Sequence, residues 1–350
     1  LEGYEGMETW SANSDKKGKV ILKMGMLNMS IHPMLIGLKK AWQKGDKTYS
    51  YHFAGADVTK NYTAHNMDPE KPIHVDLNTL QDIQVANIFY FTEGILCAFT
   101  ENPLTEEAKR ILGRFASVFG QTYRRYLDLL KAEAQAREAQ IETALERVRA
   151  RTMAMHKSEE LGEVAAVLFE QIDNLGATLE RLNIGIVREE EGVIEWWSTE
   201  QGGRQIDRLF KGSIDEPTTI SKVYSAWKES QKSLVIDQTG PELQQWISYV
   251  TEVIGLPFDP KLIQERRVHS AAFFKHGALL VSSPEPLPGD SMNLLERFAA
   301  VFEQTYTRFL DLQKAEKQAR EAEIEAALER VRAKTMAMHN TDDIAVTVTT

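Results

Sequence analysis

The residues of this chain that could bind a metal or carry out catalysis are its eight histidines, its single cysteine and its acidic side chains. Metal and haem sites need ligands that converge from characteristic spacings. No such spacing is found among six of the histidines, namely His32, His52, His65, His74, His269 and His276. The sequence also carries no Ser-His-Asp, paired-carboxylate or phosphate-loop signature. We therefore expect no metal, no cofactor and no enzymatic activity in this chain.

Cys97 is the residue to which a chromophore could be attached. It lies within the apolar run 95–99 (ILCAF), where a buried thiol behaves as a small hydrophobic side chain. The hydrophobic interpretation is the one we prefer. A single cysteine also excludes an intrachain disulfide and fits a reducing compartment.

Four tryptophans are the candidate ligand-binding residues. Trp10 and Trp42 occupy the same places in the first half of the chain as Trp197 and Trp227 in the second. Indoles on a strand and a helix could line a pocket for an unknown small molecule, because such pockets are mostly apolar. They could also belong to the hydrophobic core, which is the simpler interpretation.

The elements that would position these residues occur in two copies, because the sequence contains an internal repeat. Residues 131–156 and 314–339 are identical at 22 of 26 positions, and Pro103 matches Pro286 at the same offset of 183. Further upstream the offset grows to 187, as short loop insertions would cause. A period of this length indicates two whole domains, each with its own core, rather than a solenoid.

Both matched stretches predict long helices, because they are rich in Ala, Glu, Arg, Gln and Lys and contain no Pro or Gly. Helical periodicity persists from about 105 to 174, so the sequence predicts one continuous helix there. Apolar or small residues recur at the 4-3 spacing of a coiled coil, which predicts a parallel homodimer. The predicted dimer seam consists of Ile141, Leu145, Val148, Thr152 and Met155 in the first linker and of Ile324, Leu328, Val331, Thr335 and Met338 in the second.

Strand and helix patterns between the linkers predict the α+β class. Trp10 aligns with the second strand of the other copy, so the first helix and first strand of the N-terminal copy are missing. We predict a truncated domain at 1–104, a closing helix with its coiled-coil linker at 105–157, a second domain at 158–287, a second closing helix and linker at 288–340, and the first helix of a further domain at 341–350.

The order of these elements resembles that of a GAF domain, and residues 268–306 (VHSAAFFKHGALLVSSPEPLPGDSMNLLERFAAVFEQTY) resemble the end of one. The linker ALERVRARTMAM resembles the spacer between sensory domains of bacterial signalling proteins, often of the histidine kinase type. The resemblance implies tandem GAF-like domains in a two-component system. It further implies a six-stranded antiparallel sheet with helices on one side, a small-molecule pocket on the other, and an output through helices.

Two finer assignments within that resemblance are weakly supported by the residues. His156 and His339 follow Glu-Arg-x-Arg, as in the phosphoacceptor helix of some histidine kinases, but Lys157 and Asn340 follow them where an acidic residue is typical. We therefore expect both histidines to be ordinary surface residues. The Asn-Lys-x-x-x-Asp-Glu motif of cyclic-nucleotide-binding GAF domains is absent from the sequence.

The composition narrows the class of function. A net charge of -10 and a pI near 5.4 argue against a nucleic-acid partner, because phosphate binding needs a basic face. No run of about 18 apolar residues is present, so we expect no membrane span and a cytoplasmic location. The sequence thus predicts a non-catalytic sensor that passes a signal along dimeric helices to an output domain. The alternative is a ligand-free structural or dimerisation spacer.

Overall fold

The computed structural model describes residues 6–14, 20–66, 82–177, 179–200, 202–256 and 265–336. The chain divides into two compact units, residues 1–135 and 136–350. The division falls within one helix, so the predicted linker at 105–157 is shared between the units. Both units combine helices with antiparallel strands, which confirms the α+β class. Among the described residues, no helix has the length and apolar character that crossing a membrane requires.

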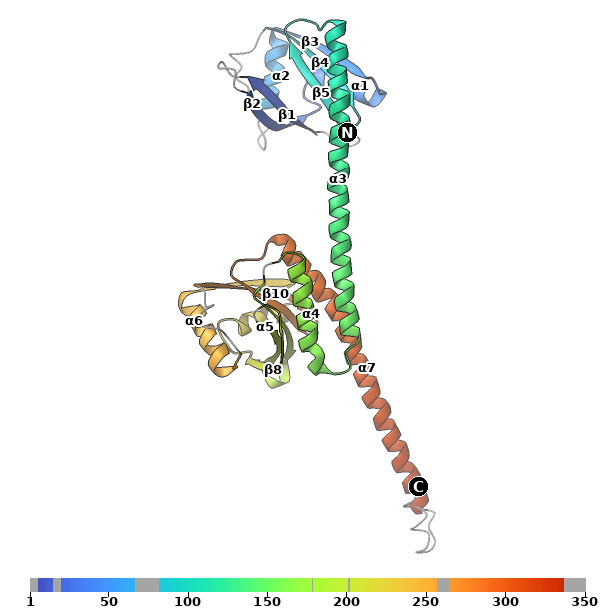
Figure 1. Cartoon of the computed structure of the whole chain (residues 1–350), viewed down its shortest axis with the longest axis vertical. Coiled ribbons are helices and arrows are strands. Elements are labelled where there is room, and N and C mark those ends of the chain that lie inside the picture. The colour runs from blue at the N-terminus through green and yellow to red at the C-terminus, as the bar shows by residue number, and fades with distance from the viewer. Residues whose placement is uncertain are drawn as a thin grey trace. The chain divides into compact units, whose positions relative to one another are not determined.

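Unit 1 contains two separate antiparallel sheets (Figure 1). Strands β1 (Gly6–Ser14) and β2 (Val20–Asn28) form one, and β3 (Thr48–Ala54), β4 (Ile83–Phe91) and β5 (Gly94–Thr100) form the other in that order. Helices α1 (Pro33–Lys44) and α2 (Ala56–Asn66) connect the strands, and α3 (Glu106–Met153) follows β5.

Helix α1 has capping residues at both ends. His32 accepts a hydrogen bond from the backbone N–H of Met34 through Nδ1, and Pro33 occupies the first turn, where its missing N–H has no helical partner in any case. Gly45 ends the helix at a φ of 80°, a left-handed conformation that favours glycine. The helix thereby buries Met34, Leu35 and Leu38 in the core of unit 1.

Unit 2 is built on one six-stranded antiparallel sheet in the order β8-β7-β6-β11-β10-β9. Its strands are β6 (Arg181–Arg188), β7 (Val193–Thr199), β8 (Gln205–Ser213), β9 (Ser233–Thr239), β10 (Arg266–Phe274) and β11 (Gly277–Ser283). Its helices are α4 (Leu161–Asn174), α5 (Ile220–Lys228), α6 (Gly240–Ser248) and α7 (Gly289–Met336), with short turns of helix at Ser158–Glu160, Glu189–Glu191 and Tyr249–Val253.

Helices cover both faces of this sheet, and not one face as the resemblance implies. On the first face, α4, α7 and the second half of α3 bury Leu182, Ile184 and Phe274 in a large apolar cluster. On the second face, α5 and the segment that follows β9 pack over Trp196, Phe210 and Leu280. The β6 and β7 strands are buried on both sides along most of their length.

The predicted continuous helix from 105 to 174 is interrupted. Helix α3 ends at Met153, and the Glu160 carboxylate then accepts hydrogen bonds from the backbone N–H groups of His156 and Lys157 at 3.1 and 3.0 Å. This carboxylate satisfies donors at the start of the next helix, as a capping residue does. The chain consequently turns, and α4 begins at Leu161 as a separate helix.

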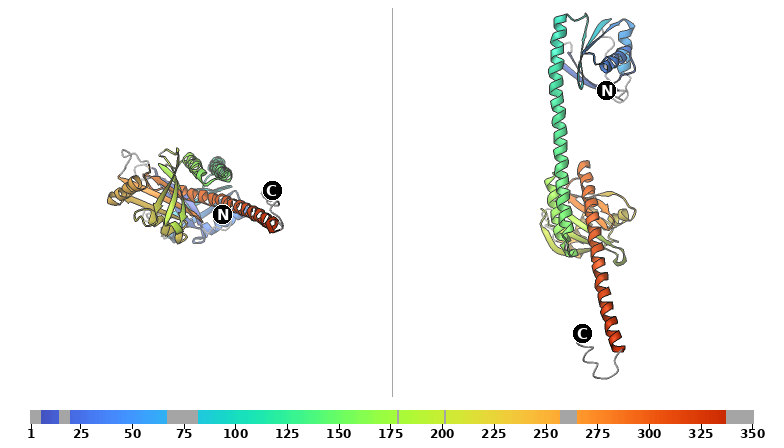
Figure 2. Two further views of the ribbon diagram at one scale, coloured as in Figure 1. Left: turned by 90° about the horizontal axis from the view of Figure 1, so that it is seen from below. Right: turned by 90° about the vertical axis from the view of Figure 1, so that its right-hand side faces the viewer.

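The second half of α3 packs within unit 2 rather than standing free. Polar contacts join it to α4, from Arg137 to the carbonyl oxygen of Leu175 and from Arg147 to Gln171 at 3.1 Å. Further ion pairs join Arg297 of α7 to Glu138 and Glu142 of α3, each at 2.7 Å. The three helices therefore form a layer over the first face of the sheet (Figures 1 and 2).

The predicted dimer-seam residues of the first linker are buried within unit 2. Leu145, Val148, Thr152 and Met155 are at most 5 % exposed, and Ile141 packs against the same cluster. Their apolar surface is already covered within the chain. In the second linker, Ile324, Leu328 and Val331 are exposed. The side chain of Thr335 and all of Met338 lie outside the described residues.

Candidate functional site

A cavity of about 50 Å³ lies on the second face of the unit 2 sheet, beneath α6 and the turn that follows it. Its walls are largely apolar and include Trp196, Phe210, Trp246, Val250, Ile254 and Leu280. The sheet also contributes a set of polar side chains to it, namely Arg181, Asn183, Ser198, Arg267, His269 and Ser282. Apolar walls with a few convergent polar groups are the usual composition of a small-molecule site.

Two guanidinium groups are the most unusual feature of this cavity. Arg181 begins β6 and Arg267 lies in β10, and both are more than nine-tenths buried. Arg267 Nη2 lies 2.5 Å from a carboxylate oxygen of Glu180. Burial and then the nearby positive charge of Arg267 lower the pKa of Arg181 to about 10. Arg181 stays protonated at neutral pH, and the negative charges of Glu200 and Glu180 act on its pKa in the opposite direction. The cavity wall therefore holds two like charges close to acidic neighbours.

His269 lies beside this pair and is a neutral imidazole. Burial, followed by the charge of Arg267, lowers the pKa of His269 to about 3. Its Nδ1 is 3.0 Å from Ser282 Oγ, and its ring meets that of Trp246 edge to face at 5.5 Å. Its Nε2 has no hydrogen-bond partner among the described residues. A neutral imidazole has one donor and one acceptor nitrogen, so Nε2 can bond a ligand or a water molecule in the cavity.

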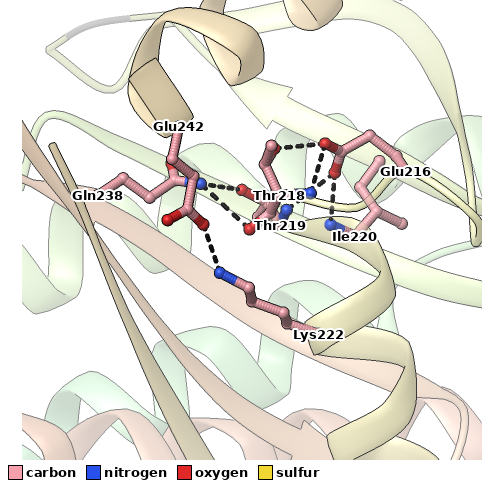
Figure 3. A network of polar contacts seen from close by, with 7 residues as sticks. All are labelled: Glu216, Thr218, Thr219, Ile220, Lys222, Gln238 and Glu242. Carbon is pink, nitrogen blue, oxygen red and sulfur yellow. Dashed lines mark hydrogen bonds and ion pairs between the residues drawn. The ribbon is translucent and has the colours of Figure 1, made fainter. Parts of the chain in front are cut away.

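A buried network fixes the start of α5 at the edge of the cavity (Figure 3). The Glu216 carboxylate accepts hydrogen bonds from the backbone N–H groups of Thr218, Thr219 and Ile220 at 2.8, 2.9 and 2.8 Å. Gln238 Nε2 donates to the carbonyl oxygen of Thr218 and to Thr219 Oγ1. A carboxylate at a helix N-terminus satisfies donors that have no helical partner. The network thereby holds Thr219 in the cavity wall.

The opposite wall is less regular. The chain leaves α6 through a turn of π-helix at Tyr249–Val253, and Val250 and Ile254 from this region line the cavity. Tyr249 Oη accepts a hydrogen bond from the backbone N–H of Ser213 at 2.9 Å, which ties the turn to β8. An ion pair between Lys222 and Glu242 connects α6 to α5. π-Turns are rare and are found frequently at functional sites.

The four predicted tryptophans do not meet at this cavity. Trp197 is buried on the first face of the sheet, and the indole N–H of Trp227 donates to the carbonyl oxygen of Phe274 at 3.0 Å. In unit 1, Trp42 packs edge-on against Tyr90, while Trp10 is 62 % exposed on β1.

The tryptophans that do line the cavity are Trp196 and Trp246. Neighbouring residues of a strand point to opposite faces, so the predicted Trp197 lies on the first face while Trp196 faces the cavity. Nothing in the sequence pattern distinguishes Trp196 from Trp197, because β7 is buried on both faces. Arg181 and Arg267 were also missed, since an arginine at the start of a strand usually indicates solvent.

The chemistry of the cavity belongs to unit 2. At the offset of 183, Gln84 and Ala86 of unit 1 take the places of Arg267 and His269. The amide oxygen of Gln84 accepts a hydrogen bond from Tyr62 Oη at 2.9 Å, so this residue serves the local core. At these two aligned positions unit 1 therefore has neither a guanidinium nor an imidazole.

Two other residues considered for chemistry have ordinary surroundings. Burial raises the pKa of the Cys97 thiol to about 12, so its reactive thiolate is scarce at neutral pH. His156 is exposed just beyond α3, and His339 lies outside the described residues. Among the residues that the structure describes, no group of three or more His, Cys, Asp or Glu could hold a metal ion.

Comparison with known families and curated proteins gives no match: neither a family model nor a curated protein matches this chain.

Proposed function

We propose that this chain is a non-catalytic sensory and signal-transmission region of an intracellular signalling protein, and that unit 2 binds a small anion. In this proposal the two units are tandem GAF-like domains. The observation that carries it is the pair of buried guanidinium groups in one apolar-walled cavity. Helices α3 and α7 pack on the other face of the same sheet and provide the output route.

A purely structural core would not need these groups. Moving a charged side chain out of water costs several kcal/mol, and replacing buried ions by apolar residues often stabilises a protein. Two arginines, a histidine and several hydroxyl and amide groups beneath α6 are costly to bury. Recognition of an anion gives them a role, because a guanidinium binds a carboxylate through two parallel hydrogen bonds.

The size of the cavity restricts the ligand. Its volume of about 50 Å³ is well below the roughly 300 Å³ at the lower end for ligand pockets. A short carboxylate fits this space, whereas a larger ligand requires α6 and its π-turn to move outward. The ligand that we propose is therefore a small carboxylate with a short apolar group.

Glu180 lies in the short segment between α4 and β6, and its carboxylate pairs with a guanidinium of the cavity. Its carboxylate pairs with Arg267, its backbone N–H donates to the carbonyl oxygen of Ser282, and its own carbonyl oxygen accepts from Gly202. Glu180 precedes β6 and follows α4, which borders α3. A ligand carboxylate that takes the place of Glu180 on Arg267 would free this connection. A ligand that binds one of two arrangements better shifts the population toward it.

Charge dependence of binding tests this proposal. Unit 2 is expected to melt at a higher temperature with acetate, butyrate or benzoate than with acetamide, butyramide or benzamide, which have similar shapes but no charge. At ten times the dissociation constant, bound ligand adds about 1.4 kcal/mol, which raises the melting temperature by roughly 3 to 5 °C. Arg181→Gln should abolish the shift, whereas Arg204→Gln, at an exposed arginine, should retain it.

Equal shifts with acids and amides, or shifts that survive Arg181→Gln, would contradict an anion site. No shift with any of the six compounds would leave the cavity without the proposed ligand class. The location of any bound carboxylate can be checked independently by NMR shift changes at His269.

The second candidate function is a ligand-free structural or dimerisation spacer. It is favoured by the exposed apolar residues Ile324, Leu328 and Val331 in the second linker, which retain the spacing of a coiled-coil seam. Under this alternative the chain is a dimer by light scattering, and Leu328→Glu with Val331→Glu makes it monomeric. A chain that is monomeric from the outset contradicts the dimeric spacer.

A further inference from the structure

Among the described residues of unit 1, no strand takes the place that β6 has at the centre of the unit 2 sheet. In unit 2, β6 pairs with β7 on one side and with β11 on the other. The counterparts of β7 and β11 in unit 1 are β1 and β5. In the described part of the chain, β1 pairs only with β2, and β5 pairs only with β4. The sheet of unit 1 is therefore split at the place where β6 lies in unit 2.

The exposure of β5 agrees with a missing neighbour. Every residue of β11 is buried, whereas every residue of β5 is at least partly exposed. Phe99, on β5, is 45 % exposed. An apolar strand with an open row of backbone N–H and C=O groups is a template for pairing with another strand.

A second, independent observation concerns the closing helix of unit 1. Its apolar face is formed by Ile111, Phe115, Val118, Phe119 and Tyr126, which are 41 to 63 % exposed. The aligned residues of α7 in unit 2 are Leu294, Phe298, Val301, Phe302 and Phe309, which are 0 to 9 % exposed. Apolar or aromatic side chains at aligned places are thus exposed on α3 and covered on α7. Contiguous exposed apolar surface of this kind marks an interaction site.

In unit 2 the cover of α7 includes α4, the helix that comes just before β6 in the sequence. Leu161, Val164 and Leu168 of α4 belong to the same apolar cluster as Phe298 and Phe302. One continuous segment, residues 161–188, therefore supplies both the helix over the closing helix and the strand in the centre of the sheet.

We infer that unit 1 is a docking site for a helix followed by a strand with the pattern of residues 161–188. The strand would lie between β5 and β1, and the helix would cover the apolar face of α3 at 111–126. The occupant must present an apolar helix face, as α4 does, and a strand that is buried on both faces and apolar on one of them, as β6 is through Leu182, Ile184 and Ile186. A second copy could pair with the β5 edge, but such pairing alone would leave the α3 face open. The helix–strand segment covers both with one continuous piece of chain.

The test adds such a segment to the whole chain. A copy of residues 157–192 replaces residues 1–5 directly before Gly6, so that the turn at 189–192 joins the added strand to β1 as it joins β6 to β7. Hydrogen–deuterium exchange of residues 94–100 and 111–126 is expected to slow by about tenfold or more, because both become covered. Binding of a hydrophobic dye should fall in parallel. The matched control carries Ile184→Pro in the added copy, which removes a sheet hydrogen bond.

The outcomes separate the possible occupants. Slower exchange in the extended chain but not in the Ile184→Pro control supports the inference. The inference is overturned if the extended chain and its Ile184→Pro control exchange equally fast. It is also overturned if both exchange as fast as the unextended chain. If light scattering shows the unextended chain to be a dimer with both regions already protected, the occupant is a second copy and the inference is wrong.

Discussion

A pair of aligned leucines offers a direct measurement of what the repeated helices pack against. Leu145 and Leu328 lie at the same place in two stretches of nearly identical sequence. Leu145 is 4 % exposed in the core of unit 2, whereas Leu328 is 51 % exposed on α7. Leu145→Ala and Leu328→Ala therefore make the same chemical change in two different surroundings.

The expected costs follow from burial. Removing three methylene equivalents from a fully buried site costs about 2.4 kcal/mol in transfer free energy, and the cavity left behind raises this to about 3 kcal/mol. At Leu328 half of the side chain is already in water, so the loss is about 1 kcal/mol or less, reduced further by the higher helix propensity of alanine. The two variants should differ by about 2 kcal/mol in the free energy of unfolding.

The assay must report on unit 2 separately, because a chain of two units need not unfold in one step. Urea-dependent hydrogen–deuterium exchange of the β11 peptide, residues 277–283, meets this need, since the strand lies inside the unit 2 sheet. Equal destabilisation by both substitutions would refute the reasoning. A larger effect of Leu328→Ala, together with loss of a dimer, would show that the second linker is buried by another chain.

Two further predictions concern the buried polar groups of unit 2. The pKa of His269 is about 3 in the fold and 6.5 in the unfolded chain, so the unfolded chain binds more protons between these two pH values. The stability that depends on neutral His269 is therefore complete above about pH 6.5 and falls by up to about 1.4 kcal/mol per pH unit below it. The variant His269→Gln should remove this slope in urea titrations. Glu216→Ala should cost about 2 kcal/mol in the same titrations, because three N–H donors at the start of α5 lose their acceptor. Glu242→Ala, which breaks only an exposed ion pair, should cost less than about 1 kcal/mol, and similar losses for the two variants would contradict the capping role.

The repeat, the helices and most strands could be predicted from sequence because each depends on local pattern. Apolar residues at helical spacing give α4 and α5, and the turn at Gly277 separates two apolar runs that pair as β10 and β11. The alignment of Trp10 with Trp197 placed both residues on equivalent strands, and they lie on β1 and β7. Local pattern and the repeat therefore carry this part of the prediction.

The cavity could not be predicted, because it depends on which face of a doubly buried strand each residue takes. Trp196 and Trp197 are both buried, and only the packing of helices on the two faces separates them. Arg181 and Arg267 come together from strands that are far apart in sequence. No spacing rule connects two such positions, since strand order in a mixed α+β fold is a property of the whole topology.

The packing of α3 also bears on the near identity of the two linkers. A dimer seam is not needed to constrain residues 136–153, because this half of α3 already contacts both α4 and α7. A single helix that closes one unit and supports the helical layer of the next must satisfy contacts on several faces, so few positions are free to vary. The same reasoning applies to Ile324, Leu328 and Val331, which are exposed on α7. They repeat the residues that α3 buries against its neighbours, and this makes the paired leucine measurement a test of whether packing within one chain or pairing between two chains governs the repeated helix.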